Sequence, residues 1–352
     1  MRALGVLMWW AFTAANGRVN PRPWDADWYL KIAELGYRGA AVGMVDAHGV
    51  ASPDGAMAFF PGYPLAVRGV AALTGGDYLA AGIAVSTLAG VIGAYGIARL
   101  TRRLGGGRRA EILAVVLVSS APMSVVYSMA YPEALLVALS AWALVAVLER
   151  RWWLAAGCTA AAGATSPMAA PLILTVMVAA FWHLYRRTDR QLGAAVAPIV
   201  APLGMLGYLL WVHETSTVPG GYFEITRRGW GNSIDFGATT LRWVVDALVA
   251  GRDAYVVLTA AAIVAAVVAT AVVRMAWPVW LYTAATVALI VVHSGLVQDR
   301  VRLLLSAFPL LILAAIRLGR VRTRTAVLVA GAIALAGLWF GAYSVSVWPY
   351  AI

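Results

Sequence analysis

The stretch 255–273, YVVLTAAAIVAAVVATAVV, contains no charged residue. A helix needs roughly 20 apolar residues to cross a bilayer, so this run is typical of a transmembrane helix. The stretch 79–98 has the same character. Of the 352 residues, 62% are hydrophobic and only 12% are charged, and the mean hydropathy is +0.79. A soluble domain has about a quarter charged residues, so the composition predicts an all-α polytopic membrane protein.

Apolar stretches of this kind recur along the whole chain. We interpret them as about 11 transmembrane helices, at about 3–15, 79–98, 111–127, 132–148, 154–165, 168–184, 193–212, 254–273, 277–293, 303–316 and 325–340. The first is short, which leaves open a signal peptide or a span with a late start codon. Between the fifth and the sixth, the pair Ser166-Pro167 predicts a break between two short helices, which keeps the arginine pattern downstream, whereas one kinked helix would invert it.

Charge predicts the orientation of the chain. Of the 27 basic residues 26 are arginine, and 16 of these are Arg2 or belong to the connections 99–110, 149–153, 185–192, 274–276 and 317–324. Cytoplasmic loops accumulate Lys and Arg, so these connections and the N-terminus are predicted inside. The long loops 16–78 and 213–253 then lie outside, and long loops commonly carry function. We expect one membrane-embedded domain, 1–352, in the plasma membrane, with its active site on the extracytoplasmic face.

The first outer loop contains WDADWYLKIAELGY (24–37), with two carboxylates among aromatic residues. This stretch predicts a short amphipathic helix in the membrane interface, capped by Asp25 and ended by Gly36. Its expected apolar face is formed by Trp28, Ile32 and Leu35. The stretch 62–74 predicts a second interfacial helix, which would bring Arg68 near lipid headgroups.

Helical spacing separates the two aspartates. Asp25 shares the stripe of Trp28, whereas Asp27 lies on the polar face and can pair with Lys31 at i+4. A carboxylate held against apolar surface is typical of a general base, although Asp25 could serve only as a cap. We therefore expect Asp25 to take part in chemistry and Asp27 to support the helix.

Five segments resemble, in order, the bacterial relatives of the PIG-V mannosyltransferases, which belong to the GT-C class of membrane glycosyltransferases. They are WDADWYLKIAELGY (24–37), AFFPGYPLAVRG (58–69), SMAYPEALLVALSAWAL (128–144), YFEITRRGWGNSIDFGATTLRW (222–243) and DRVRLLLSAFPLLI (299–312). The resemblance implies a GT-C bundle that transfers mannose with inversion, from polyprenyl-phosphate mannose to a lipid-linked or membrane-proximal acceptor. It maps the essential aspartate of the family onto Asp25. It also assigns substrate-side positions to Tyr131, Glu133 and Arg302.

Two departures from the family pattern stand out. Ser166 occupies a position where the family often has arginine, and Thr226 replaces a frequent glutamine. These changes leave open a specialised or inactive member.

The chemistry of such a transfer needs a base for the acceptor hydroxyl and cations for the departing phosphate. Asp25 offers the first, and the guanidinium groups of Arg302 and Arg300 offer the second. Both arginines could instead snorkel to headgroups at a helix end. Glu133 could bind sugar or simply occupy a turn, and Trp230 could be a sugar platform or an interfacial anchor.

The expected partners are the lipid-linked sugar donor, its acceptor and membrane lipids, without nucleic acid and without a cofactor. No spacing among His48, His213 and His293 suggests a metal site, and the metal requirement is left open. The alternatives are transfer of another lipid-linked sugar, a non-catalytic scaffold, or a transporter. A transporter would place ionisable residues within its spans, and the spans here contain almost none.

Overall fold

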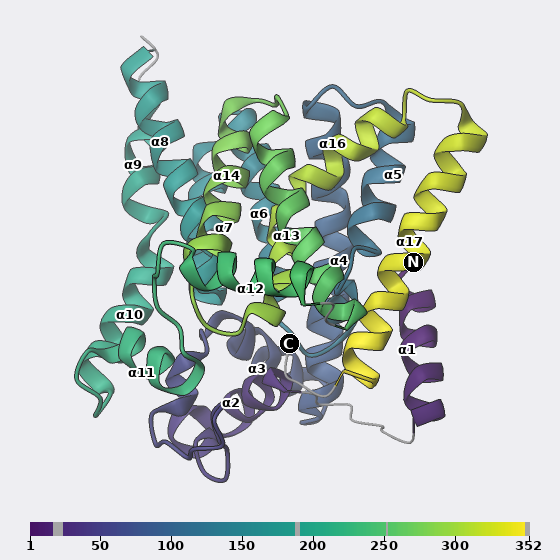
Figure 1. Ribbon diagram of the computed structural model, residues 1–352. Helices are drawn as coiled ribbons and strands as arrows, with labels where there is room; N and C mark the ends of the chain where they lie inside the picture. Colours follow the sequence, from purple (N-terminus) through teal and green to yellow (C-terminus); the bar gives the residue numbers. More distant parts are fainter. Residues whose placement is uncertain (17–23, 187–190, 251–252, 349–352) are drawn as a thin grey trace.

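The fold, seen in a computed structural model, consists of helices joined by loops, with one isolated β-bridge, in the part of the chain that it describes, residues 1–16, 24–186, 191–250 and 253–348 (Figure 1). The arginines of 187–190 lie outside these residues. Ten of the eleven predicted spans correspond to a helix or to two consecutive helices, namely α1 (Arg2–Asn16), α4 (Tyr78–Arg103), α6 (Glu133–Leu148), α7 (Trp152–Thr165), α8 (Ala170–Arg186), α9 (Leu192–Val200) with α10 (Leu203–Thr215), α13 (Ala254–Val272), α14 (Trp277–Val292), α15 (Arg300–Leu303) with α16 (Pro309–Leu318), and α17 (Thr323–Ser346). The predicted span 111–127 is helical only in its first part, as α5 (Arg108–Ser119), and continues through a loop into the 3-10 helix η2 (Ser124–Ser128). The predicted all-α fold class is confirmed.

The number of membrane crossings is a separate matter from the number of helices. Among the described residues, five helices are long and apolar enough to cross a bilayer, or six if the bent pair Arg300–Ala307 and Pro309–Leu318 is one span. The axes of that pair differ by 62°. The count of about 11 crossings therefore stays a prediction.

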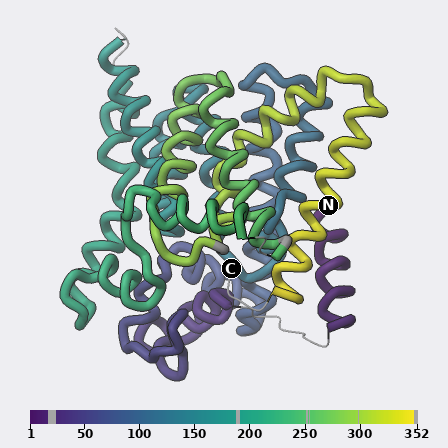
Figure 2. The backbone as a smooth tube through the Cα atoms, viewed as in Figure 1, coloured from purple at the N-terminus to yellow at the C-terminus, as the bar shows by residue number. Residues whose placement is uncertain are grey.

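The two long loops fold into short helices at one end of the bundle. The first loop forms α2 (Asp25–Ala40), the 3-10 turn η1 (Gly55–Ala58) and α3 (Gly62–Leu73), so the predicted second helix is confirmed. The second loop forms α11 (Gly221–Trp230) and α12 (Ala238–Val249), and the latter runs across the bundle (Figure 1). The connections α4–α5, α13–α14 and α16–α17 lie at the opposite end (Figure 2). The arginine-rich connections and the long loops thus lie at opposite ends.

Small residues let the helices of the core approach closely. A Cβ atom added at Gly93 of α4 would lie 3.3 Å from the Cβ of Ala138 in α6, already a tight contact. Helix association within a bilayer depends on this kind of close packing, because lipid is as apolar as the helices themselves.

The prediction of two helices around Ser166-Pro167 is also confirmed, since α7 ends at Thr165 and the Ser166 hydroxyl accepts a hydrogen bond from the Met168 amide.

The predicted location of Arg2 is wrong. The sequence predicts it at the arginine-rich end, whereas its guanidinium donates to the Ser86 carbonyl and to the Ser128 hydroxyl, both at 3.3 Å. Ser86 lies in the first half of α4, so α1 begins part-way along the bundle and runs beside α17 toward the long loops (Figure 1). Fifteen helical residues extend only about 22 Å, which is too short to reach the other end.

Candidate functional site

Asp25 is the first residue of α2, and its carboxylate does not cap the helix. The preceding residue, Trp24, has φ 48° and ψ −117°, and no side chain caps this end. The predicted capping role of Asp25 is therefore wrong. The physical reason is that Asp25 Oδ2 accepts a hydrogen bond of 2.8 Å from Arg302 Nη1.

The predicted apolar face of α2 is only partly correct. Trp28 and Ile32 are buried, but they pack against other parts of the protein, including Phe59. Leu35 is 55% exposed and does not share their face. The opposite side, with Leu30, packs into the main core. The helix is thus enclosed from two sides and lies in the protein, which differs from a helix resting on the membrane interface.

Gly36 interrupts α2 as predicted, with φ 72° and ψ 176°, although the chain resumes a helical path up to Ala40. Arg68 of α3 compensates for the break. Its guanidinium donates to the Ala33 carbonyl at 2.6 Å and to the Ile32 carbonyl at 3.3 Å. In a continuous helix these carbonyls would accept from the amides of Gly36 and Tyr37. Arg68 therefore supports α2, whereas the sequence suggested lipid headgroups.

Arg302 is the centre of a charged cluster. Its Nη1 bonds Asp25, its Nε lies 3.5 Å from Glu133 Oε1, and its guanidinium carbon lies 5.5 Å from the centre of the Tyr131 ring. The side chains of Arg302 and Glu133 are each 12% exposed, and that of Asp25 is 23% exposed. The structure thus brings together four of the predicted site residues from three distant parts of the chain.

Two polar atoms in this cluster lack protein partners. Within the described residues, Arg302 Nε and Glu133 Oε2 are buried without a hydrogen bond. Buried polar groups without partners are uncommon and costly, and they are often explained by function. The cluster therefore has hydrogen-bonding capacity that the described residues do not use.

Asp299 joins this environment, and the sequence reasoning missed it. Burial, opposed by Arg302 and reinforced by the charge of Asp25, raises the pKa of Asp299 to about 6. The sequence feature that could have indicated Asp299 is its position in DRVR (299–302), directly before Arg300. Burial, followed by the charges of Asp25 and Glu133, also raises the pKa of Tyr29 well above its usual range. Tyr29 therefore stays neutral and can only act as a hydrogen-bonding phenol.

An aromatic wall adjoins the charged cluster. The Tyr29 ring packs edge-on against Tyr131 and Phe59, with centroids 6.3 and 5.2 Å apart. Phe59 stacks on Trp28, and Trp230 packs edge-on against both at 5.5 and 6.4 Å. Trp230 thus brings the second long loop onto α2, and Phe59 is a central residue that the sequence reasoning did not single out.

Three other residues that the sequence singled out, Arg300, Asp27 and Thr226, lie outside the contacts of this cluster that are described above. Arg300 is fully buried, and its guanidinium donates to the Thr240 hydroxyl and to the His293 carbonyl, which ties α12 to the end of α14. It has no exposed surface to offer a phosphate in this structure. Asp27 is half-buried on α2, and its pairing with Lys31 stays a prediction. The hydroxyl of Thr226 bonds carbonyls of its own helix.

Comparison with known proteins places this geometry in context. Residues 59–211 match the family model described as dolichyl-phosphate-mannose-protein mannosyltransferase. This segment contains Tyr131 and Glu133 but neither Asp25 nor Arg302. The search of curated proteins found no match to the sequence.

Two solved structures share the fold. The structure of ArnT from Cupriavidus metallidurans bound to undecaprenyl phosphate has 17% identity and a TM-score of 0.55, over 96% of this chain and 61% of that one. The apo structure of the same protein has 19% identity and a TM-score of 0.54, over 92% and 59%. The chain thus spans about three fifths of the length of ArnT. It is an integral membrane protein with an ArnT-like GT-C fold, and the narrower PIG-V resemblance stays a prediction.

Proposed function

We propose that the protein is a membrane glycosyltransferase that takes mannose from a polyprenyl-phosphate carrier and transfers it to a hydroxyl group of a lipid-linked or membrane-proximal acceptor. The observation that carries this proposal is the contact between Arg302 and Asp25, whose positions are 277 residues apart in sequence. A cation and a carboxylate so placed match the two requirements of the reaction. The ArnT structure bound to undecaprenyl phosphate supports a polyprenyl-phosphate donor. The description of the matching family supports mannose as the sugar.

In the proposed reaction the acceptor oxygen attacks the anomeric carbon of the sugar, and the bond from that carbon to the phosphate oxygen breaks. Asp25 accepts the proton of the acceptor hydroxyl. The polyprenyl phosphate leaves with one more negative charge than it carried in the donor. The guanidinium of Arg302 stabilises this charge with its forked donors, and its unpartnered Nε is one of the groups available for it.

The contact between Arg302 and Asp25, formed without substrate, agrees with the proposed role of each residue. Arg302 holds Asp25 at 2.8 Å on one side and faces Glu133 at 3.5 Å on the other. The carboxylate is thereby kept in a fixed orientation before substrates arrive, which lowers the entropic cost of reaching a reactive geometry. One base and one displacement invert the anomeric centre, whereas a double displacement uses a pair of carboxylates about 5 Å apart.

The side of the membrane follows from the same proposal. The cluster lies among the long loops, at the end away from the arginine-rich connections, and cytoplasmic loops are those richest in arginine. We therefore propose that transfer takes place on the extracytoplasmic face, next to a donor whose lipid tail remains in the bilayer.

The direct test incubates purified protein with radiolabelled polyprenyl-phosphate mannose and a membrane lipid extract, followed by identification of labelled products. Parallel reactions use the glucose and arabinose forms of the same carrier. Labelled product from the mannose donor alone is the expected result. Product from another sugar would replace mannose in the proposal, and absence of product from every donor would favour a scaffold.

A further inference from the structure

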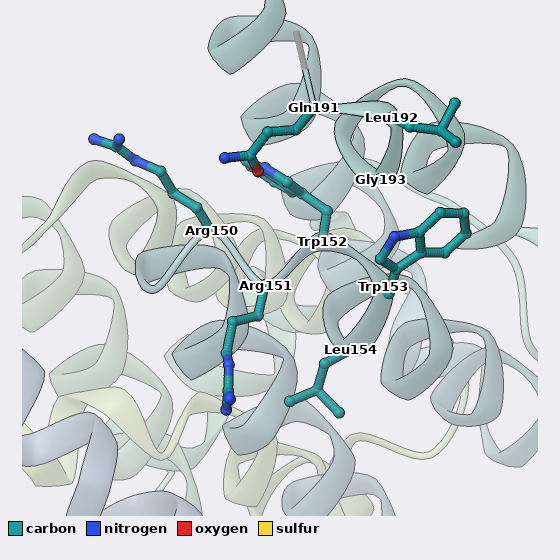
Figure 3. A pocket seen from close by; sticks show the side chains of 8 residues that line it. All are labelled: Arg150, Arg151, Trp152, Trp153, Leu154, Gln191, Leu192 and Gly193. Carbon is teal, nitrogen blue, oxygen red and sulfur yellow. The ribbon is translucent and has the colours of Figure 1, made fainter. Parts of the chain in front are cut away.

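A hollow lies at the arginine-rich end, far along the bundle from Asp25. Its volume is about 570 Å³, and it opens between the start of α7 and the start of α9 (Figure 3). Arginine, tryptophan and glutamine side chains line it together with aliphatic ones. The proposed sugar transfer makes no use of this hollow.

Backbone donors gather at this hollow because α7 starts there. The first hydrogen bond of the helix runs from the Ala155 amide to the Arg151 carbonyl, so the amides of Trp152, Trp153 and Leu154 precede the bonded ladder. No side chain caps this end. The N-terminal end of a helix carries partial positive charge and attracts anions.

The side chain of Trp152 gives an independent indication of a ligand. This residue is only 4% exposed, and its indole nitrogen is buried without a hydrogen-bond partner within the described residues. Figure 3 shows the indole directed toward the Gln191 side chain at the hollow. An indole N–H can only donate, and none of the described residues accepts from it, so this group is available to a ligand that carries an acceptor.

Local charge favours an anion as that acceptor. The adjacent carboxylate, Glu149, is occupied on the other side, because it accepts from Arg99 at 2.7 Å and from Arg103 at 2.8 Å. It therefore does not neutralise Arg150 and Arg151, which are both exposed and line the hollow. Two cations, the start of α7 with its three free amides, and one indole donor thus belong to the lining of the same hollow.

The rim of the hollow is apolar and exposed. Trp153 is 60% exposed and Leu192 is 70% exposed, as expected of side chains that contact lipid. Tryptophan is enriched where a bilayer meets water, and basic pockets between helices on that side bind anionic headgroups. We propose that this hollow binds the phosphodiester of an anionic phospholipid, with the acyl chains lying along Trp153 and Leu192.

The test uses the full-length protein in nanodiscs that contain phosphatidylglycerol and phosphatidylcholine, with native mass spectrometry of the lipid that stays bound. The double variant Arg150→Gln/Arg151→Gln is expected to retain phosphatidylglycerol about thirtyfold more weakly. Trp152→Phe keeps the ring but removes the donor, and it is expected to weaken retention about fivefold.

The matched control is Arg108→Gln/Arg320→Gln, which removes the same charge from exposed positions at the same end. Unchanged retention in this control is the expected result. An equal loss in the control would show general surface attraction and overturn the site. Equally strong binding of inorganic phosphate, or of glycerophosphoglycerol without acyl chains, would overturn the assignment to a lipid.

Discussion

At the scale of single residues, the structure places the two aspartates of α2 on different sides of the helix. Asp25 contacts Arg302, which stands in a group with Glu133 and Tyr131. Asp27 is half-buried on another side of the same helix. The difference arises because two residues on a helix are turned by about 200°, so the two side chains leave α2 in different directions.

Replacement of Asp25 is therefore expected to abolish transfer. Asp25→Asn keeps an oxygen that Arg302 can bond but removes the base, so the rate should fall at least about a hundredfold. Asp27→Asn is the matched control, with an expected loss below about threefold. Labelled-mannose transfer by purified protein measures both, with size-exclusion profiles as a check on folding. If Asp25→Asn retained a tenth of the activity, Asp25 could not be the base.

Asp299 gives a pH-dependent prediction. Its pKa of about 6 exceeds the usual 3.8, so the folded protein favours the neutral acid. The folded state then binds more protons than the unfolded state between these values, and stability falls as the pH rises through them. The contribution is fully present below about pH 3.8 and is lost above about pH 6.

Asp299→Asn mimics the neutral acid at every pH. It should stabilise the protein by about 2 kcal/mol at pH 8 and much less near pH 4. Thermal unfolding midpoints in detergent at the two pH values measure this difference. A variant that is less stable than the wild type at pH 8 would show that the attraction of Arg300 and Arg302 outweighs the cost of burial.

At the scale of elements, the two long loops are joined by a buried carboxylate. Asp54, next to η1, is 4% exposed and accepts hydrogen bonds from the Thr217 amide at 2.9 Å and the Thr217 hydroxyl at 2.7 Å. The Tyr208 hydroxyl of α10 donates to the Met57 and Phe59 carbonyls of the first loop. These bonds hold the aromatic wall against the charged cluster.

Removal of this link should loosen the second loop. Asp54→Ala leaves the Thr217 amide without its acceptor, and such a loss destabilises by about 1–3 kcal/mol. Hydrogen exchange of 213–220 should accelerate, and the KM for the acceptor should rise more than kcat falls. Asp77→Ala is the control, because Asp77 is exposed and only caps α4 through the Ala80 amide. Equal acceleration in both variants would mean that Asp54 does not act specifically on this loop.

At the scale of the whole molecule, the fold separates two ends with different chemistry. One end carries the long loops and the charged cluster, and the other carries the arginine-rich connections, with pairs such as Arg102–Glu111 at 2.8 Å. The hollow beside Arg151 belongs to the second end. The proposed reaction and the proposed lipid site would therefore face opposite leaflets.

Orientation can be tested with introduced cysteines, because the sequence contains only Cys158. In a Cys158→Ser background, His48→Cys should react with a membrane-impermeant maleimide in intact cells. Arg320→Cys should react only after permeabilisation. Both positions are exposed, so accessibility to the reagent reports the side of the membrane. The reverse pattern would place the charged cluster in the cytosol, and the proposed transfer on the outer face would then be wrong.

The sequence by itself determined the membrane setting, the positions of the apolar helices and the break at Ser166-Pro167. These features depend on hydrophobic length and on proline geometry, which are local properties of the chain. It also supplied Asp25, Tyr131, Glu133 and Arg302 as candidates, through a resemblance. Their roles in catalysis stay predictions.

Only the tertiary structure decided which neighbours those residues have. Asp25 could equally have capped α2, but Arg302 reaches it from 277 positions away. Arg300, two residues earlier, turns instead to Thr240 and His293 and is fully buried. Arg68 and Leu35 were misplaced for the same reason. Periodicity tells which side of a helix a residue occupies, whereas packing between distant segments determines what lies on that side.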